Sequence, residues 1–167
     1  MMTAVDVERG SGEFATMKIH VNHIPPEGIQ QRVTYNPALM DLDRPDIHLR
    51  EPFEVESFLA LADRELIITA DIRCPLHVTC ARCLEEFAHV LRTHSIFNYH
   101  VRLTDVVDIT DDVRQEIILA YPVVPLCRPD CKGLCSRCGN NLNHAPCGHD
   151  VVKDDSEDPH RGGSIVL

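Results

Sequence analysis

The sequence predicts an α+β fold of mostly antiparallel strands, with one clear helix at about residues 110–120 and a C-terminal cysteine lobe that resembles a zinc ribbon. Three observations predict this fold. Apolar and polar residues alternate in several runs, one later stretch has helical spacing, and five of the eight cysteines lie between Cys127 and Cys147. Alternation with a period of two is typical of strands that bury one face.

The first predicted strand and turn lie close to the N-terminus. The run Met17-Lys-Ile-His-Val21 alternates as a half-buried strand does. The four residues Pro25-Pro-Glu-Gly28 then predict a turn. Strand-like sequence resumes at Phe53 and reaches Asp63-Arg-Glu65, which we interpret as the corner of a hairpin.

Two longer runs follow that corner. Between Leu66 and Val78, a period of two places one set of residues on a common face: Ile68, Ala70, Ile72 and Cys74. Cys74 is therefore interpreted as a small buried hydrophobe rather than a ligand. The segment from Phe87 to Val101 predicts a further pair of strands, although two histidines, His89 and His94, obscure its faces.

The predicted helix starts after a cluster of residues that favour helix N-termini. Either Asp108 or Thr110 could cap the first free amides. Helical spacing then recurs at Val113, Ile117 and Ala120. Because Pro122 opposes continuation of a helix, we expect residues 121–125 to be extended and to lead directly into the cysteines.

Composition limits the classes of function. The chain has 167 residues, 44% of them hydrophobic, and a formal net charge of −10. That charge argues against sequence-independent binding of nucleic acid. The first residues lack the apolar run of a secretory signal, and no apolar stretch of about 18 residues predicts a membrane span. We therefore expect a cytoplasmic protein, in which cysteines favour metal over disulfides.

We expect four parts along the chain. The sequence predicts a flexible N-terminus at 1–15, an α+β core domain at 16–126, a zinc-binding lobe at 127–150 packed on that core, and a flexible tail at 151–167. The tail is expected to be flexible because from Asp150 onward it has five acidic and two basic residues, with Gly162-Gly163 near its end.

Two CxxC pairs carry the strongest chemical signal. They are Cys80-Ala-Arg-Cys83 and Cys135-Ser-Arg-Cys138. Two intervening residues let a tight turn direct both sulfurs at one ion, and tetrahedral zinc takes four N or S ligands, usually as two such pairs. Gly139 follows the second pair and can adopt the positive φ that such a turn needs.

The preferred arrangement is two zinc sites, although the sequence also allows one. The expected ligands are Cys80, Cys83, Cys127 and Cys131 in the first site and Cys135, Cys138, Cys147 and His149 in the second. His144 is the alternative to His149. With four protein ligands per ion, no coordination position is left for a reactive water, so the sites are expected to be structural.

Other readings of the cysteines remain open. Thiolates also bind iron, so an iron–sulfur redox protein is one alternative, and a generic zinc-ribbon interaction module is another. A radical enzyme with the spacing Cys131-x3-Cys135-x2-Cys138 would need a large barrel, for which too few residues follow. The sequence has no HExxH, GxSxG, P-loop or GxGxxG motif, so we expect no enzyme.

Several runs resemble one family. They are Glu116-Ile-Ile-Leu-Ala-Tyr-Pro-Val-Val-Pro-Leu-Cys127, Pro129-Asp-Cys-Lys-Gly-Leu-Cys135, Cys138-Gly-Asn-Asn-Leu-Asn143 and, upstream, Cys80-Ala-Arg-Cys83-Leu84. Together they resemble the YceD family, the large ribosomal RNA subunit accumulation proteins, over roughly Leu66 to Asp150. Family members commonly end the cluster with CxC, where this chain has Cys147-Gly-His149, and this departure favours His149 over His144 as a ligand.

The resemblance implies a bacterial or organellar protein of ribosome biogenesis that is needed for 23S rRNA to accumulate, a role without a known catalytic activity. The partners we expect are the pre-ribosomal large subunit, rRNA or a basic ribosomal protein, the last because it suits the acidic charge of the chain, with no membrane and no small-molecule substrate. Our expected contact surface consists of Lys132, Arg137, Asn140, Asn141 and Asn143, whose side chains suit phosphate or base edges. The alternative for the asparagines is that they only shape turns.

Overall fold

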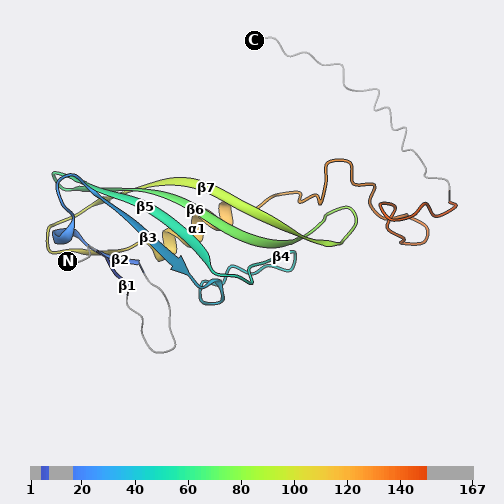
Figure 1. Cartoon of the computed structure of the whole chain (residues 1–167), viewed down its shortest axis with the longest axis horizontal. Coiled ribbons are helices and arrows are strands. Elements are labelled where there is room, and N and C mark those ends of the chain that lie inside the picture. Colours follow the sequence, from blue (N-terminus) through green and yellow to red (C-terminus); the bar gives the residue numbers. More distant parts are fainter. Residues whose placement is uncertain (1–4, 8–16, 150–167) are drawn as a thin grey trace, which may run out of the picture.

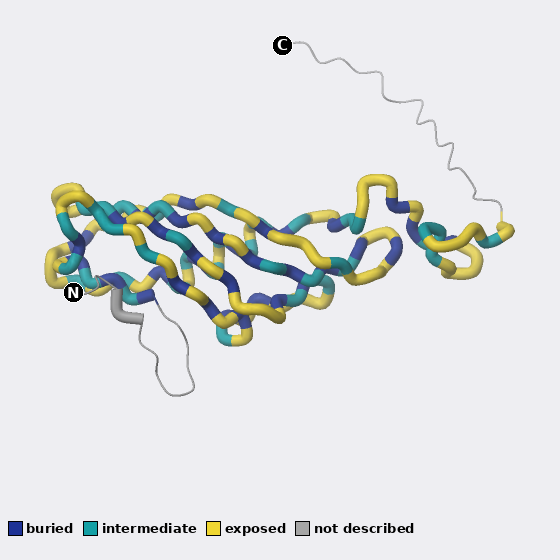
Figure 2. Tube along the Cα trace, viewed as in Figure 1, coloured by how far each residue is buried: buried dark blue, intermediate teal, exposed yellow. Residues whose placement is uncertain are grey.

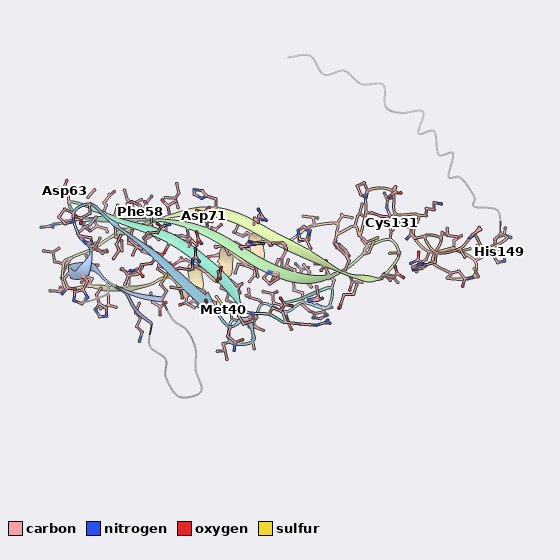
Figure 3. The ribbon with its side chains drawn as sticks, in the orientation of Figure 1. Met40, Phe58, Asp63, Asp71, Cys131 and His149 are labelled. Atoms are coloured by element: carbon pink, nitrogen blue, oxygen red, sulfur yellow. The ribbon has the colours of Figure 1, made fainter. Side chains whose placement is uncertain are left out.

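The computed structural model describes residues 5–7 and 17–149. The expected flexible segments at both ends lie outside these residues, except for Val5–Val7, which form a strand. Figure 1 shows an elongated molecule in which a body of strands occupies one end and the cysteine lobe the other. Asp63 and His149 mark these two ends in Figure 3.

The described part of the chain contains eight strands and one α-helix, so the predicted α+β class of mostly antiparallel strands is confirmed. Short 3-10 helices lie at Val21–His23 and Pro37–Leu39. The other elements are β1 (Val5–Val7), β2 (Met17–His20), β3 (Ile29–Tyr35), β4 (Ile47–His48), β5 (Phe53–Ala62), β6 (Glu65–Thr79), β7 (Glu86–His100), β8 (Val106–Asp108) and α1 (Thr110–Leu119). None of the helices in the described residues has the length and apolar character required to cross a membrane.

Two antiparallel sheets make up the body. The larger sheet has the order β3-β5-β6-β7, and β4 pairs with the far end of β6 beyond β5. The smaller sheet has the order β1-β2-β8. Strand β6 is the centre of the larger sheet because its 15 residues are long enough to pair with β5 at one end and β4 at the other.

The predicted turns lie where the sequence placed them. β5 and β6 form a hairpin whose last pair is Ala62 with Glu65, and Asp63 adopts a left-handed φ of 55° between them. In the earlier turn, the amide of Gly28 donates to the carbonyl of Pro25 at 2.9 Å. Gly28 has a φ of 80°, and a Cβ there would lie 2.9 Å from the carbonyl oxygen of Leu59, so only glycine fits.

The core fills the space on one side of the larger sheet. Alternate residues of β6 from Leu66 to Val78 are buried there, and the alternation is visible along the tube in Figure 2. Cys74 is fully buried within this core, as predicted, and burial raises its pKa to about 12. The core is largely aliphatic; its stacked ring pair is Tyr35 with Phe53, whose centroids lie 5.4 Å apart.

The predicted pair of strands at 87–101 is wrong, because this segment is the single strand β7. It pairs with β6 without interruption from Glu65 opposite His100 to Thr79 opposite Glu86. The segment contains neither glycine nor proline to start a turn, and the long partner strand gives every residue a cross-strand neighbour. Leu91 and Ser95 are buried on its core-facing side, whereas His89 and His94, which obscured the pattern in the sequence, are exposed.

Helix α1 packs on the core side of β6 and β7 through the buried Val113 and Ile117. Neither proposed residue is the N-cap, which is Ile109 and makes no side-chain capping bond, although Asp108 accepts a hydrogen bond from the amide of Thr110 at 2.9 Å. The Thr110 hydroxyl instead accepts from the amide of Met17 at 3.3 Å. The helix ends at Leu119, ahead of Pro122, as the sequence predicted.

Candidate metal centres

The tip of the β6–β7 hairpin forms the first cysteine knuckle. Between the end of β6 at Thr79 and the start of β7, the amide of Cys80 donates to the carbonyl of Glu85 at 2.9 Å. The amide of Leu84 donates to the carbonyl of Cys80 at 3.0 Å, and Leu84 has a left-handed φ of 60°. The long hairpin thus carries Cys80 and Cys83 away from the core.

The second knuckle repeats the backbone of the first. The amide of Cys135 donates to the carbonyl of Asn140 at 2.8 Å, and the amide of Gly139 donates to the carbonyl of Cys135 at 2.9 Å. These are the same two bonds at the same sequence offsets. Gly139 has a φ of 73°, so the predicted positive φ after the second CxxC pair is confirmed.

The chain after α1 is tied to the body and then to the hairpin tip. The hydroxyl of Tyr121 donates to the carbonyl of Leu42 at 2.7 Å. The amide of Ala81 donates to the carbonyl of Pro125 at 2.8 Å. These bonds bring Cys127 to the first knuckle, where its amide donates to Sγ of Cys80 at 3.4 Å.

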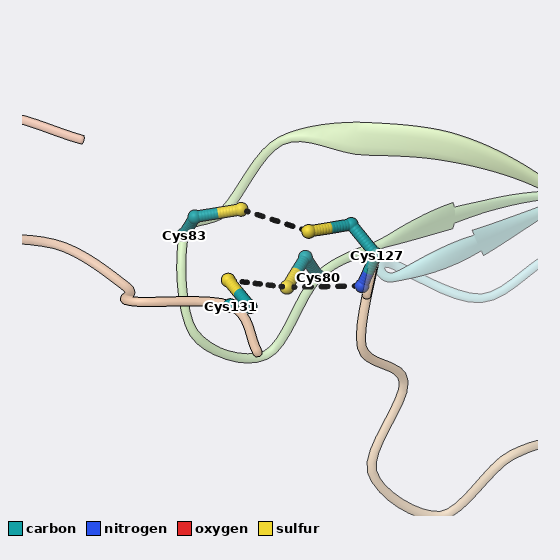
Figure 4. Close-up of side chains that lie close together, drawn as sticks. All are labelled: Cys80, Cys83, Cys127 and Cys131. Atoms are coloured by element: carbon teal, nitrogen blue, oxygen red, sulfur yellow. Dashed lines mark hydrogen bonds between the residues drawn. The ribbon is translucent and has the colours of Figure 1, made fainter. Parts of the chain in front are cut away.

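Four sulfurs converge at this point into the group that we call the hairpin-tip cage, shown in Figure 4. Its members are Cys80, Cys83, Cys127 and Cys131. Their Sγ atoms all lie within 4.8 Å of one another. Cys80 and Cys131 are 3.8 Å apart at Sγ, and Cys83 and Cys127 are 3.7 Å apart although 44 positions separate them in sequence. All but Cys127 are buried, in a small cluster of their own outside the main core.

The geometry of the hairpin-tip cage fits a single tetrahedral metal ion. With Zn–S bonds of about 2.3 Å, the edge of a regular tetrahedron of sulfurs is about 3.8 Å. A disulfide would need sulfurs about 2.05 Å apart. A polynuclear iron–sulfur cluster spreads its thiolates over several irons and would hold them further apart. The distances therefore suit a mononuclear site with four thiolate ligands.

The pKa values of the thiols in the hairpin-tip cage also favour a bound cation. Burial raises the pKa of Cys80, but the backbone amides of Cys83 and Cys127 outweigh it and lower the pKa to about 6. Burial raises the pKa of Cys127 to about 12, and its neighbouring thiols add to this. Neighbouring thiols lower the pKa of Cys80 and Cys131 but raise that of Cys127, so without a positive charge among them the four thiols do not all ionise together, whereas a divalent cation would favour four thiolates.

A second group of donors, which we call the distal cage, lies further along the lobe. Its members are Cys135, Cys138, Cys147 and His149. Sγ of Cys135 lies 3.9 Å from Nδ1 of His149, against about 3.6 Å for ideal tetrahedral zinc bonds to S and N. Backbone amides of Cys138 and Arg137 lower the pKa of Cys135 to about 6. Cys138 and His149 are exposed, so the distal cage is more open to solvent than the hairpin-tip cage.

The structure thus brings the eight predicted ligands together in the two groups expected from sequence. His144, the alternative ligand, lies outside both groups, and its Nε2 is 2.5 Å from a carboxylate oxygen of Glu85. Metal occupancy and the identity of the metal remain predictions.

The proposed contact residues have mixed environments. Lys132 and Arg137 are exposed. Asn143 accepts a hydrogen bond from the amide of Lys132 at 2.8 Å and donates to Sγ of Cys131 at 3.3 Å. Asn141 accepts from the amide of Asn143 at 2.9 Å. Two of the three asparagines therefore shape the lobe, and only Asn140 keeps an exposed side chain.

Sequence reasoning missed two groups that support the hairpin-tip cage. Asn143 donates to a ligand sulfur, and Arg82 donates from Nη1 to the carbonyl of Cys131 at 3.1 Å. No spacing rule connects either residue to Cys131: the Asn143 contact depends on how the lobe folds back on itself, and the Arg82 contact forms only when the hairpin tip meets the lobe. The lobe lies beyond the end of the sheet and meets the body at the hairpin tip (Figure 1).

These features define the class of this protein: an antiparallel β body that carries, at one end, two groups of four potential metal ligands. Uncharacterized proteins of Mycobacterium bovis and Mycobacterium tuberculosis are 32% identical to it over 164 residues, which is 87% of this chain and 72% of theirs. An uncharacterized protein of Mycobacterium leprae is 29% identical over 135 residues, 71% of this chain and 62% of its own. No solved structure matches the chain.

The family model of the large ribosomal RNA subunit accumulation protein YceD matches residues 97–161. The chain belongs to the YceD family, and the resemblance found in its cysteine motifs is confirmed. Membership supports a role in the accumulation of large-subunit ribosomal RNA.

Proposed function

We propose that the protein is a non-enzymatic, zinc-stabilised factor of ribosome biogenesis, which acts in the cytoplasm and supports accumulation of 23S rRNA and the large ribosomal subunit. The observation that carries the proposal is the convergence of Cys80 and Cys83 with Cys127 and Cys131 in a member of this family. The hairpin-tip cage is placed to join the body to a lobe that could dock on a partner.

Zinc is the metal we propose for both cages. When bound, it would supply folding free energy on the order of 10 kcal/mol in a small module of this kind. Each cage offers four protein donors, which satisfies a tetrahedral ion and leaves no position for substrate or water. This closed donor set supports a structural role, and we propose no catalytic step.

The lobe is the proposed contact with the pre-ribosomal large subunit. Residues 127–149 carry three basic side chains, Arg128, Lys132 and Arg137, and one acidic side chain, Asp130. The whole chain has a formal charge of −10, so the lobe is locally basic on an acidic protein. Exposed basic groups of this kind attract rRNA phosphates, whereas the acidic body suits a basic ribosomal protein. We propose rRNA as the ligand of the lobe.

Metal analysis of the purified chain tests the zinc proposal. We expect close to two zinc ions per chain and a colourless protein, because each cage binds one ion. An absorbance band in the visible region, with iron in the preparation, would instead support the iron–sulfur alternative and reject zinc.

A charge-reversal pair tests the contact surface. We expect the double variant Lys132→Glu with Arg137→Glu to reduce co-sedimentation with the large subunit and to lower 23S rRNA in cells. The matched control is Arg64→Glu with Arg102→Glu, which makes the same charge change on exposed residues at the opposite end of the β6–β7 hairpin. If both pairs have equal effects, net charge rather than the lobe explains the result. If neither has an effect, the proposed surface is wrong.

A further inference from the structure

Strand β7 forms one margin of the larger sheet, and its outer edge is free (Figure 1). All 15 of its residues pair with β6 on the inner side. Within the described residues, none of the other backbone-to-backbone hydrogen bonds involves an amide or carbonyl of Glu86–His100. At about 3.4 Å per residue, the open edge is about 50 Å long.

Proteins usually protect such an edge, and β7 lacks the usual protections. Short length, proline, bulges and charged residues block pairing with another chain. β7 has no proline and no bulge, and its formal charge, with histidines not counted, is zero because Glu86 is its one acid and Arg92 its one base. The chain as a whole is acidic, so most of its surface repels the surface of a second copy. Because the β7 edge has no net charge, two copies can approach one another there.

The opposite margin of the sheet is a poorer place for pairing. Strand β3 has only seven residues, and its exposed face carries Arg32 in an ion pair with Glu56 of β5. The exposed large apolar residues near the margin of the sheet lie instead on β7, where Val90 is 44% exposed and Ile96 is 60% exposed. Exposed apolar side chains on an open edge favour pairing that covers them.

We propose that β7 pairs antiparallel with β7 of a second copy, around a two-fold axis at Thr93. Residues directly opposite one another in antiparallel strands lie on the same face. This register therefore keeps α1 of both copies on one side of the joined sheet. The opposed pairs are Glu86 with His100, Phe87 with Tyr99, Ala88 with Asn98, His89 with Phe97, Val90 with Ile96, Leu91 with Ser95 and Arg92 with His94.

This register is better than its nearest neighbours. It matches Val90 with Ile96 twice on the outer face, and on the core side it matches the rings of Phe87 and Tyr99 twice. A shift by two residues in one direction puts Arg92 opposite Arg92, which like charges oppose. A shift by two in the other direction puts Ile96 opposite Arg92 and breaks the apolar match. A shift by one would place the helices of the two copies on opposite sides.

The resulting dimer has a defined shape. The larger sheets of the two copies join into one, and the hairpin tip of each copy lies beside the His100 end of the other. The two cysteine lobes therefore point away from one another and stay free. This inference does not rest on the proposed ribosomal function.

Photo-crosslinking of the full chain tests the register. A benzoylphenylalanine in place of Ile96, in a mixture of unlabelled and ¹⁵N-labelled copies, is expected to crosslink mainly to Val90 and its neighbours on the other copy. Mass spectrometry distinguishes crosslinks between copies from those within one copy. Crosslinks within one copy alone, or between copies at sites away from β7, would overturn the proposal.

Sedimentation velocity tests the dimer itself. We expect a concentration-dependent dimer, and Val90→Lys with Ile96→Lys is expected to raise its dissociation constant by about tenfold or more, since lysines then oppose one another across both apolar pairs. The matched control is Phe58→Lys, on the same outer face of β5 but away from the edge, with a side chain 45% exposed. It should leave the dissociation constant unchanged. A monomer at every soluble concentration, or an equal effect of both changes, would overturn the proposal; the crosslinking result does not depend on how well the lysine variants fold.

Discussion

Leu84 holds in the first knuckle the backbone position that Gly139 holds in the second. Each follows the second cysteine of its CxxC pair, and each donates its amide to the carbonyl of the first cysteine. Both have a left-handed φ, 60° for Leu84 and 73° for Gly139. A residue with a Cβ pays about 1 kcal/mol or more for this conformation, whereas glycine does not.

Replacing Leu84 by glycine is therefore expected to stabilise the fold by up to about 1 kcal/mol. The side chain is 64% exposed, so its removal sacrifices little burial. Thermal unfolding at a fixed zinc concentration measures the change.

The matched control is Gly139→Ala, which is expected to destabilise by a similar amount. An added Cβ at Gly139 meets nothing within 4 Å, so the effect isolates backbone strain from packing. Destabilisation by Leu84→Gly would mean that the leucine makes contacts in solution that outweigh the strain.

The two cages should release metal at different rates. The hairpin-tip cage is mostly buried, whereas the distal cage exposes Cys138 and His149. We expect a chromogenic chelator to report two phases, a fast one from the distal cage and a slow one from the hairpin-tip cage.

Single ligand changes assign the phases. Cys138→Ser is expected to abolish the fast phase and leave the slow one. Cys83→Ser is expected to remove the slow phase and to lower thermal stability much more, because Cys83 helps to join segments 44 positions apart. Release in a single phase would show that the cages are not independent.

Asn143 should strengthen metal binding without touching the metal. Its side chain donates to Sγ of Cys131 at 3.3 Å, and this is the first cause of the lowered pKa of that thiol. Loss of such a supporting contact commonly costs about tenfold in affinity. We expect Asn143→Ala to weaken zinc binding by about that factor in competition with a chelator.

Asn140→Ala provides the comparison, because that side chain is exposed and the Asn140 bond to the knuckle comes from its backbone carbonyl. It should leave the affinity of both cages unchanged. Equal losses from the two alanine variants would argue that both act through the shape of the turn.

The buried hydroxyl of Tyr121 should contribute to stability. It donates to the carbonyl of Leu42, which is 2% exposed, so Tyr121→Phe leaves that carbonyl without its partner. We expect a loss of about 1–3 kcal/mol in denaturant unfolding.

Tyr99→Phe removes a hydroxyl whose bond goes to the half-buried carboxylate of Asp112. Water can replace this bond, so we expect a smaller loss than for Tyr121→Phe. A larger loss would show that the contact between α1 and β7 is the stronger attachment.

Short-range features of the fold followed from sequence. The β5–β6 corner, the buried face of β6 and the helix of α1 depend on neighbouring residues, whose spacing reports backbone type and burial. The segment that forms β7 is one strand rather than the two that its sequence predicts, because its length is set by pairing with β6 and nothing within β7 itself indicates that partner.

By itself, the sequence determined the two knuckles, because CxxC spacing is a local property of the backbone, and its motifs led to the expected division of the eight ligands between two sites, His149 included. Only the tertiary structure decided that Glu85 pairs with His144, and that Asn143 and Arg82 support Cys131. The contacts of Glu85 and Arg82 form only when the hairpin tip meets the lobe, and the Asn143 contact depends on how the lobe folds back on Cys131, so no local spacing predicts them.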